Sequence, residues 1–145
     1  MKKVAFLSVA SFLLVAWWTA SVLAADLLAA QMICDTNGDG IYAGPGETAG
    51  GTTRITTAGD LRFKLSGLEA EKTYTCNLSC SFNLSHTVFS QDCVADSHGR
   101  LNVVFAGVAT PEALGTGCVL PIPFIFTSPG FCDMGYGTNA PADLP

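Results

Sequence analysis

Six cysteines constrain this chain more than any other feature of its sequence. They are Cys34, Cys76, Cys80, Cys93, Cys118 and Cys132, and all follow an N-terminal apolar segment. An even number of cysteines behind an export signal indicates a disulfide framework. A zinc site is the competing interpretation, but the chain has no CxxC pair and only His86 and His98 to assist. We therefore expect three disulfides.

The N-terminus has the layout of a secretory signal peptide. Lys2 and Lys3 precede an apolar run over 4–18, and the small residues Val22 and Ala24 follow where a signal peptidase requires them. The uncharged run is also long enough for an uncleaved anchor, which needs about 20 residues. We expect 1–24 to be a cleaved signal peptide and the protein to be secreted, either to the periplasm or to the cell surface and exterior.

Cleavage would leave 121 residues, which suits a single domain with a real core. This part has five basic and twelve acidic side chains, a net charge of about −7. Such a charge argues against nucleic acid and anionic membranes as partners and agrees with a bound cation.

The pattern after the signal is that of short β-strands. Apolar side chains alternate with polar ones over 61–66, 73–80 and 101–105, and 86–93 is a further candidate strand. The Gly- and Thr-rich stretch 44–53 is predicted as loop. We expect an all-β, disulfide-stapled antiparallel sandwich of seven or eight strands over 25–134, with a tail at 135–145.

Two smaller elements follow from proline. Pro111 to Leu114 predicts one helical turn, with Thr110 as its N-cap. Pro121 and Pro123 interrupt the apolar stretch 117–126, and neither can donate to a β-ladder. That stretch is therefore predicted as an edge strand or an extended loop.

The stretch 65–78 resembles the strand-corner-strand segment of fibronectin type III and related bacterial immunoglobulin-like domains. Leu68 and Tyr74 have the spacing of a tyrosine corner, in which the hydroxyl bonds to the backbone upstream. Ala70 replaces the usual Pro, and about 70 residues follow Tyr74, whereas the corner lies near the C-terminus in fibronectin modules. The resemblance implies an immunoglobulin-like sandwich without fixing its strand order; an ordinary hairpin with a core aromatic is the alternative.

The segment 35–47, DTNGDGIYAGPGE, resembles the EF-hand-like loops of secreted bacterial proteins, including those of dockerin type. The resemblance implies that calcium is held by side-chain oxygens at alternate positions, a backbone carbonyl and a terminal acid, here Asp35, Asn37, Asp39, Ile41 and Glu47. The acid stands one place late, because Gly46 occupies the twelfth position. Asn-Gly and Asp-Gly also favour turns, so a hairpin tip without metal is the alternative.

Cysteine pairing is not fixed by sequence, since six cysteines allow fifteen pairings. Proximity along the chain favours Cys118–Cys132 and Cys80–Cys93, which leaves Cys34–Cys76. Cys76 and Cys80 share a face of one strand and are expected to bond to other strands rather than to each other.

The sequence supplies no catalytic constellation, and we expect a protein that is not an enzyme. The expected function is that of a secreted module with a structural calcium loop, acting in extracellular assembly or adhesion through a protein partner or through self-association. The alternative is a secreted inhibitor or effector that presents the Cys118–Cys132 loop. Its interaction patch would consist of Leu120, Ile122, Phe124 and Phe126; burial of this segment as a strand is the favoured interpretation.

Overall fold

The computed structural model describes residues 26–40, 46–80, 86–126 and 130–134. The predicted signal peptide 1–24, the predicted tail 135–145 and Ile41 lie outside these residues. Eight strands and one helical turn are present in the described part: β1 (Asp26–Asp35), β2 (Gly50–Thr56), β3 (Leu61–Ser66), β4 (Thr73–Ser79), β5 (Thr87–Val94), β6 (Leu101–Phe105), α1 (Pro111–Leu114), β7 (Ile122–Phe126) and β8 (Phe131–Asp133).

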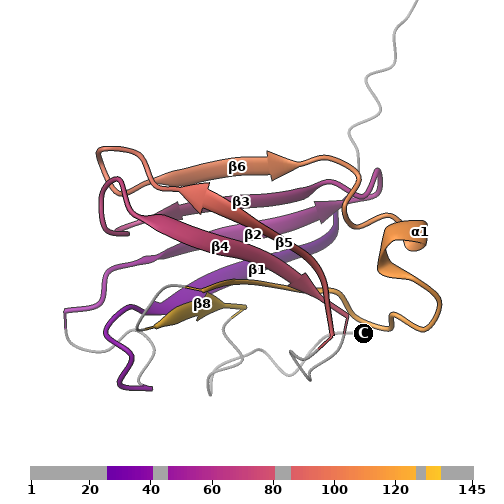
Figure 1. The fold of residues 1–145 in the computed structure, drawn as a ribbon, viewed down its shortest axis with the longest axis horizontal. Coiled ribbons are helices and arrows are strands. Elements are labelled where there is room, and N and C mark those ends of the chain that lie inside the picture. Colours follow the sequence, from indigo (N-terminus) through magenta and orange to yellow (C-terminus); the bar gives the residue numbers. More distant parts are fainter. Residues whose placement is uncertain (1–25, 41–45, 81–85, 127–129, 135–145) are drawn as a thin grey trace, which may run out of the picture.

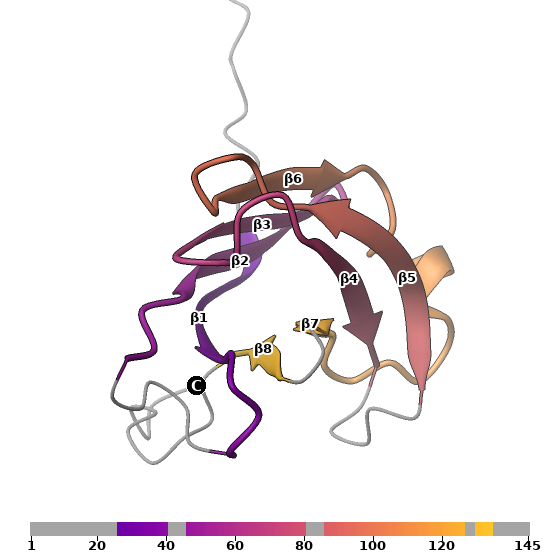
Figure 2. The ribbon, with the colours of Figure 1, turned by 60° about the vertical axis from the view of Figure 1, so that its left-hand side comes forward.

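All eight strands belong to one antiparallel sheet in the order β5-β4-β7-β8-β1-β2-β3-β6. The sheet is strongly curved and nearly closes on itself, so that β4 and β5 face β1 and β2 across the interior and the two edge strands, β5 and β6, approach each other (Figures 1 and 2). The predicted all-β antiparallel fold is confirmed. A single curved sheet encloses the core, and its two halves are joined through β7, β8 and β1.

Period-two alternation places the core. In β3, Leu61, Phe63 and Leu65 are buried while the residues between them are exposed. Tyr74 and Leu78 of β4 enter the same cluster from the facing half of the sheet. Burying side chains of this size stabilises the fold by about 1.5–3 kcal/mol each. The alternation therefore fixes which face of each strand points inward.

The tyrosine corner is present. Leu68 and Tyr74 are buried, and the backbone N–H of Glu69 donates to the Tyr74 hydroxyl at 2.9 Å. The corner packs against the turn between β5 and β6, because the N–H of Leu68 donates to the carbonyl of Gly99 at 3.0 Å. Two connections far apart in sequence are therefore joined at one end of the sheet.

All six cysteines are paired, but the predicted partners were wrong. The disulfides are Cys34–Cys132, Cys76–Cys93 and Cys80–Cys118. The prediction preferred cysteines close in sequence, whereas the pairs follow the order of strands in space. Cys34 and Cys132 lie directly opposite on β1 and β8, and Cys76 and Cys93 lie on adjacent strands β4 and β5. Cys76 and Cys80 do bond elsewhere than to each other, as expected.

Strand β7 is not the edge strand or loop that its prolines predicted. It lies between β4 and β8, and its Ile122 and Pro123 pair with β4. Strand β8 pairs only with Ile125 and Phe126 at the far end of β7. Pro123 is tolerated because its half of the strand has a ladder on one side only.

Two local expectations have opposite outcomes. Helix α1 forms with Thr110 as its N-cap, whose hydroxyl accepts from the N–H of Ala113 at 3.2 Å. The predicted loop 44–53 is wrong in its second half, because Gly50 to Thr53 belong to β2. Pairing with β1 and β3 on both sides outweighs the low strand propensity of glycine there.

Candidate functional site

The loop that begins at Asp35 is anchored at the end of β1. Its first residue pairs with Phe131 of β8, next to the Cys34–Cys132 disulfide. Asp35 is 2% exposed, although its side chain is a carboxylate. A buried carboxylate needs hydrogen-bond donors, and the chain that follows supplies them.

The Asp35 carboxylate folds the loop around itself. One oxygen accepts from the N–H of Gly38 at 2.6 Å and the other from the N–H of Gly40 at 2.8 Å. Asn37 and Asp39 form a second small ring, in which the Asp39 N–H donates to the Asn37 carbonyl oxygen at 2.9 Å. The Asn37 amide nitrogen donates to the Asp39 carboxylate at 3.1 Å.

Glu47 reaches this loop from its other end. Its Oε1 accepts from the N–H of Thr36 at 2.5 Å and from the N–H of Asn37 at 3.2 Å. Four of the five predicted ligand residues therefore belong to one hydrogen-bonded loop. The fifth, Ile41, lies outside the described residues.

The donor set suits calcium chemically, since Asp35, Asn37, Asp39 and Glu47 offer only oxygens to a hard cation. In the described conformation, however, oxygens of all four side chains accept hydrogen bonds within the loop. Among the described residues there is no group of three His, Cys, Asp or Glu side chains arranged to hold a metal. The described geometry is that of a hydrogen-bonded turn, and calcium would have to displace several of these bonds.

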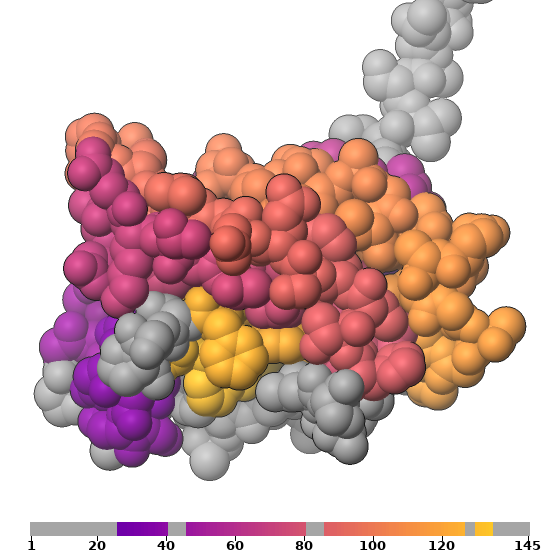
Figure 3. All heavy atoms as spheres, in the orientation of Figure 1, coloured from indigo at the N-terminus to yellow at the C-terminus, as the bar shows by residue number. Residues whose placement is uncertain are grey.

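Two of the four residues of the predicted interaction patch are internal. Ile122 and Phe124 are 5% and 2% exposed, so neither can form part of a contact surface. Leu120 is half-buried, and Phe126 is 52% exposed and packs near Phe131, with ring centroids 6.2 Å apart. The β7–β8 hairpin reaches the surface between the segments of β1 and of β4–β5 (Figure 3). Burial as a strand, the favoured interpretation, holds for Ile122 to Ile125, whereas Val119 and Phe126 at the two ends of the segment are exposed.

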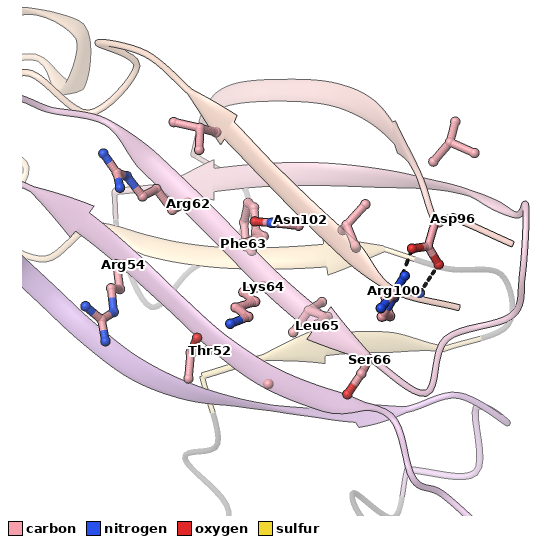
Figure 4. A pocket seen from close by; sticks show the side chains of 14 residues that line it. Thr52, Arg54, Arg62, Phe63, Lys64, Leu65, Ser66, Asp96, Arg100 and Asn102 are labelled. Carbon is pink, nitrogen blue, oxygen red and sulfur yellow. Dashed lines mark hydrogen bonds and ion pairs between the residues drawn. The ribbon is translucent and has the colours of Figure 1, made fainter. Parts of the chain in front are cut away.

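A second candidate surface was not predicted. The outer side of β2, β3 and β6 is a shallow hollow of about 1060 Å³ whose lining includes Arg54, Arg62, Lys64 and Arg100, which together we call the basic face (Figure 4). Arg54 stands directly opposite Arg62. Lys64 stands opposite Thr52 on one side and Asn102 on the other. The signal in the sequence was the outward alternation of basic residues in β3, which becomes a patch only once the neighbouring strands are known.

Three carboxylates at the rim pair with the arginines of the basic face. Asp26 lies 3.2 Å from Arg54, Asp60 lies 3.6 Å from Arg62, and Asp96 lies 3.0 Å from Arg100. Lys64 has no acidic partner within the part of the chain that the structure describes. The Asp96 pKa is held below its ordinary range, first by the N–H of Arg100 and then by the N–H of His98 and the Arg100 guanidinium.

No protein-family model, characterised protein or solved structure gives a significant match to this chain. The described residues contain no helix of the length and apolar character that a membrane crossing requires.

Proposed function

We propose that the protein is an exported, non-catalytic β-domain that acts in cell-surface or extracellular assembly or adhesion, by binding a protein partner or other copies of itself. The observation that supports this most strongly is the pairing of all six cysteines in three disulfides. Such frameworks are typical of oxidising compartments outside the cytosol. The amphipathic strands and the acidic surface also suit a domain working in aqueous surroundings.

Export and assembly are tested together by expressing the full-length sequence and analysing the protein that is secreted. We expect N-terminal sequencing to begin at Ala25, immediately after the predicted signal. We expect light scattering on the purified, oxidised protein to detect self-association, or a pull-down from the producing cell's surface fraction to detect a stable partner. A chain that begins at Met1 in the membrane fraction, or a monomer with no partner at the cell surface, contradicts the proposal.

The same proposal gives the 35–47 loop a structural calcium ion. Its support is the convergence of Asp35, Asn37, Asp39 and Glu47 on one short loop beside the Cys34–Cys132 disulfide. These residues would hold the ion, which would supply rigidity and neutralise clustered carboxylates. Because bound calcium competes with the hydrogen bonds of the described turn, we expect an affinity at the weak end for extracellular modules, about 10⁻⁴–10⁻³ M.

Thermal melting with 10 mM calcium, with 10 mM magnesium and with chelator tests the ion. Mass action at this affinity stabilises the folded protein by about 1.4–2.7 kcal/mol, which raises the melting temperature by several degrees. Asp39→Asn should abolish most of that shift. The matched control Asp92→Asn, an exposed aspartate of β5, should keep it. Identical melts with calcium and chelator remove the ion from the proposal and leave the hydrogen-bonded turn.

One observation favours the inhibitor or effector alternative. Val119 is 93% exposed and directly follows Cys118, which is tied to Cys80. The disulfide anchors the start of this segment covalently, and such a constraint lowers the ordering cost when an exposed segment binds a partner. A protein that stays monomeric at high concentration and loses its partner on Val119→Asp would favour this alternative over assembly.

A further inference from the structure

We propose that the basic face binds an extended, acidic segment of a partner polypeptide that lies along β3. This inference rests on the proposed function, because it names the chemistry of the partner that such a module would bind. It goes beyond the calcium loop and the 118–132 segment, neither of which contributes to this face. Figure 4 shows the side chains from β2, β3 and β6 that line the hollow.

Charge on this molecule is sharply divided. The basic face holds four of the five Lys and Arg residues that follow the predicted signal. Outside this face and its three ion pairs, the described residues have eight carboxylates and one amine, that of Lys72. An acidic segment is therefore repelled over most of the surface and attracted at one place, which steers it to the basic face.

The positions of two of the arginines lower the stability of the sheet. Arg54 and Arg62 are directly opposite on β2 and β3, and like charges in that position destabilise a sheet. Asp26 and Asp60 relieve the repulsion only from the rim, through exposed pairs that contribute little. A local rule broken in this way is typical of a functional surface, where a bound anion would offset the repulsion.

The cations are spaced as an extended peptide requires. Arg62 and Lys64 alternate along the outer side of β3, and Arg100 comes immediately before Leu101, which pairs with Leu65. Residues at alternate positions of a strand lie about 6.6–6.8 Å apart. Acidic side chains at alternate positions of an extended segment repeat at the same distance and can meet successive cations.

The surroundings favour a polypeptide over a simple anion. The amide side chain of Asn102 and the hydroxyl groups of Thr52 and Ser66 offer hydrogen bonds between the cations. Val94 and Val104, at 59% and 51% exposed, provide apolar contacts at the side of the hollow. The face therefore presents cations separated by polar and apolar groups. A peptide in which acidic residues alternate with polar or apolar ones would complement this surface.

The experiment compares two synthetic octapeptides of equal composition on the exported, oxidised protein. In one, four Glu and four Thr alternate; in the other, the four Glu form one block. We expect the alternating peptide to bind at least about threefold more tightly by calorimetry or fluorescence anisotropy, a difference within the range of one exposed ion pair. Binding of both should weaken in 0.5 M salt. Equal binding of the two peptides, or none at millimolar peptide, overturns the proposal.

Single-charge variants place the binding on this face. Lys64→Gln removes an exposed amine that holds no ion pair within the described residues, so we expect an unchanged melt and about a twofold to fivefold loss of affinity. Arg62→Gln should cause a similar loss. Lys72→Gln is the control, because it removes one positive charge away from the face, where Lys72 pairs with Glu69 at 2.8 Å; it should leave affinity unchanged. Equal losses in Lys64→Gln and Lys72→Gln overturn the assignment.

Other occupants are distinguished in the same assay. Tighter binding to a sulfated polysaccharide than to the alternating peptide would overturn the polypeptide assignment. A different outcome is that the protein binds no peptide but self-associates, and that Lys64→Gln abolishes the self-association. That result would assign the basic face to a second copy of the chain and overturn the proposal of an extended acidic segment. Failure of the peptide leaves the proposed function standing if the protein still assembles or retains a surface partner; failure of both export and assembly removes the proposed function itself.

Discussion

The Tyr74 hydroxyl is the clearest case of one atom fixing local structure. It accepts from the N–H of Glu69, a backbone group that the turn leaves without a strand partner. Tyr74→Phe keeps the buried ring and removes only this acceptor, so we expect a loss of about 1–2 kcal/mol in the free energy of unfolding. Denaturant titration measures it. Equal midpoints for Tyr74→Phe and the parent protein contradict the role of the corner.

Asp96 makes a prediction about pH at the same scale. Its pKa is lowered in the folded protein, first by the N–H of Arg100 and then by the N–H of His98 and by the Arg100 guanidinium. A depressed pKa contributes stability above the ordinary value, near 4, and that contribution is lost as pH falls through the folded value. Asp96→Asn should therefore be less stable than the parent at pH 7, and the gap should close below about pH 4. A gap that does not narrow as pH falls below about 4 contradicts this account.

At the scale of elements, the sequence predicts what is local and misses what depends on neighbours. Strand β3 and helix α1 follow from alternation and from a Thr-Pro start, and the Leu68–Tyr74 spacing predicts the corner. The first part of β2, Gly50 to Thr53, is predicted as loop because its glycines weaken any pattern, and only pairing on both sides makes it a strand. The convergence of Glu47 on the 35–47 loop was predicted, yet the hydrogen bonds that occupy its oxygens were not.

The disulfides show the same limit at a larger distance. The alternation of apolar and polar residues places Cys76 on the inner face of its strand. The sequence does not indicate, however, that β5 is the neighbour of β4 on one side and β7 on the other. Sheet order depends on long-range packing, which a single sequence does not display. The basic face was missed for this reason too, because its residues come from β2, from β3 and from the turn before β6.

The contact between the two turns supports a prediction about glycine. Gly99 has φ +69°, and a Cβ there would lie 2.1 Å from the carbonyl oxygen of Leu68. Gly107 has nearly the same φ, +68°, but a Cβ there meets nothing within 4 Å. Both Gly→Ala changes carry the backbone cost of about 1–2 kcal/mol, and Gly99→Ala adds a clash with backbone. We expect Gly99→Ala to be at least about 1 kcal/mol more destabilising by denaturant titration; equal losses would show that the turns do not depend on this contact.

At the scale of the whole molecule, the disulfide between β1 and β8 joins the first strand to the last. Cys34–Cys132 spans 98 residues, whereas Cys76–Cys93 spans 17 and joins two strands that are already neighbours. Strand β8 is also only three residues long, so its hydrogen bonds alone hold the junction weakly. The junction between the two halves of the sheet therefore depends on this disulfide.

Replacing both cysteines of either disulfide with alanine tests whether the junction depends on Cys34–Cys132. Loop entropy in the unfolded chain gives a loss of about 4.7 kcal/mol for Cys34/Cys132 and about 3.1 kcal/mol for Cys76/Cys93. The first variant also leaves β8 poorly held, so its loss should exceed the entropy difference, and hydrogen exchange should rise in β1 and β8 before it rises in β3 and β6. The second variant should keep those strands protected and loosen only the edge strand β5. The reverse order of stabilities would place the weak point of the fold at β5 instead, and would mean that packing rather than the disulfide closes the sheet between β8 and β1.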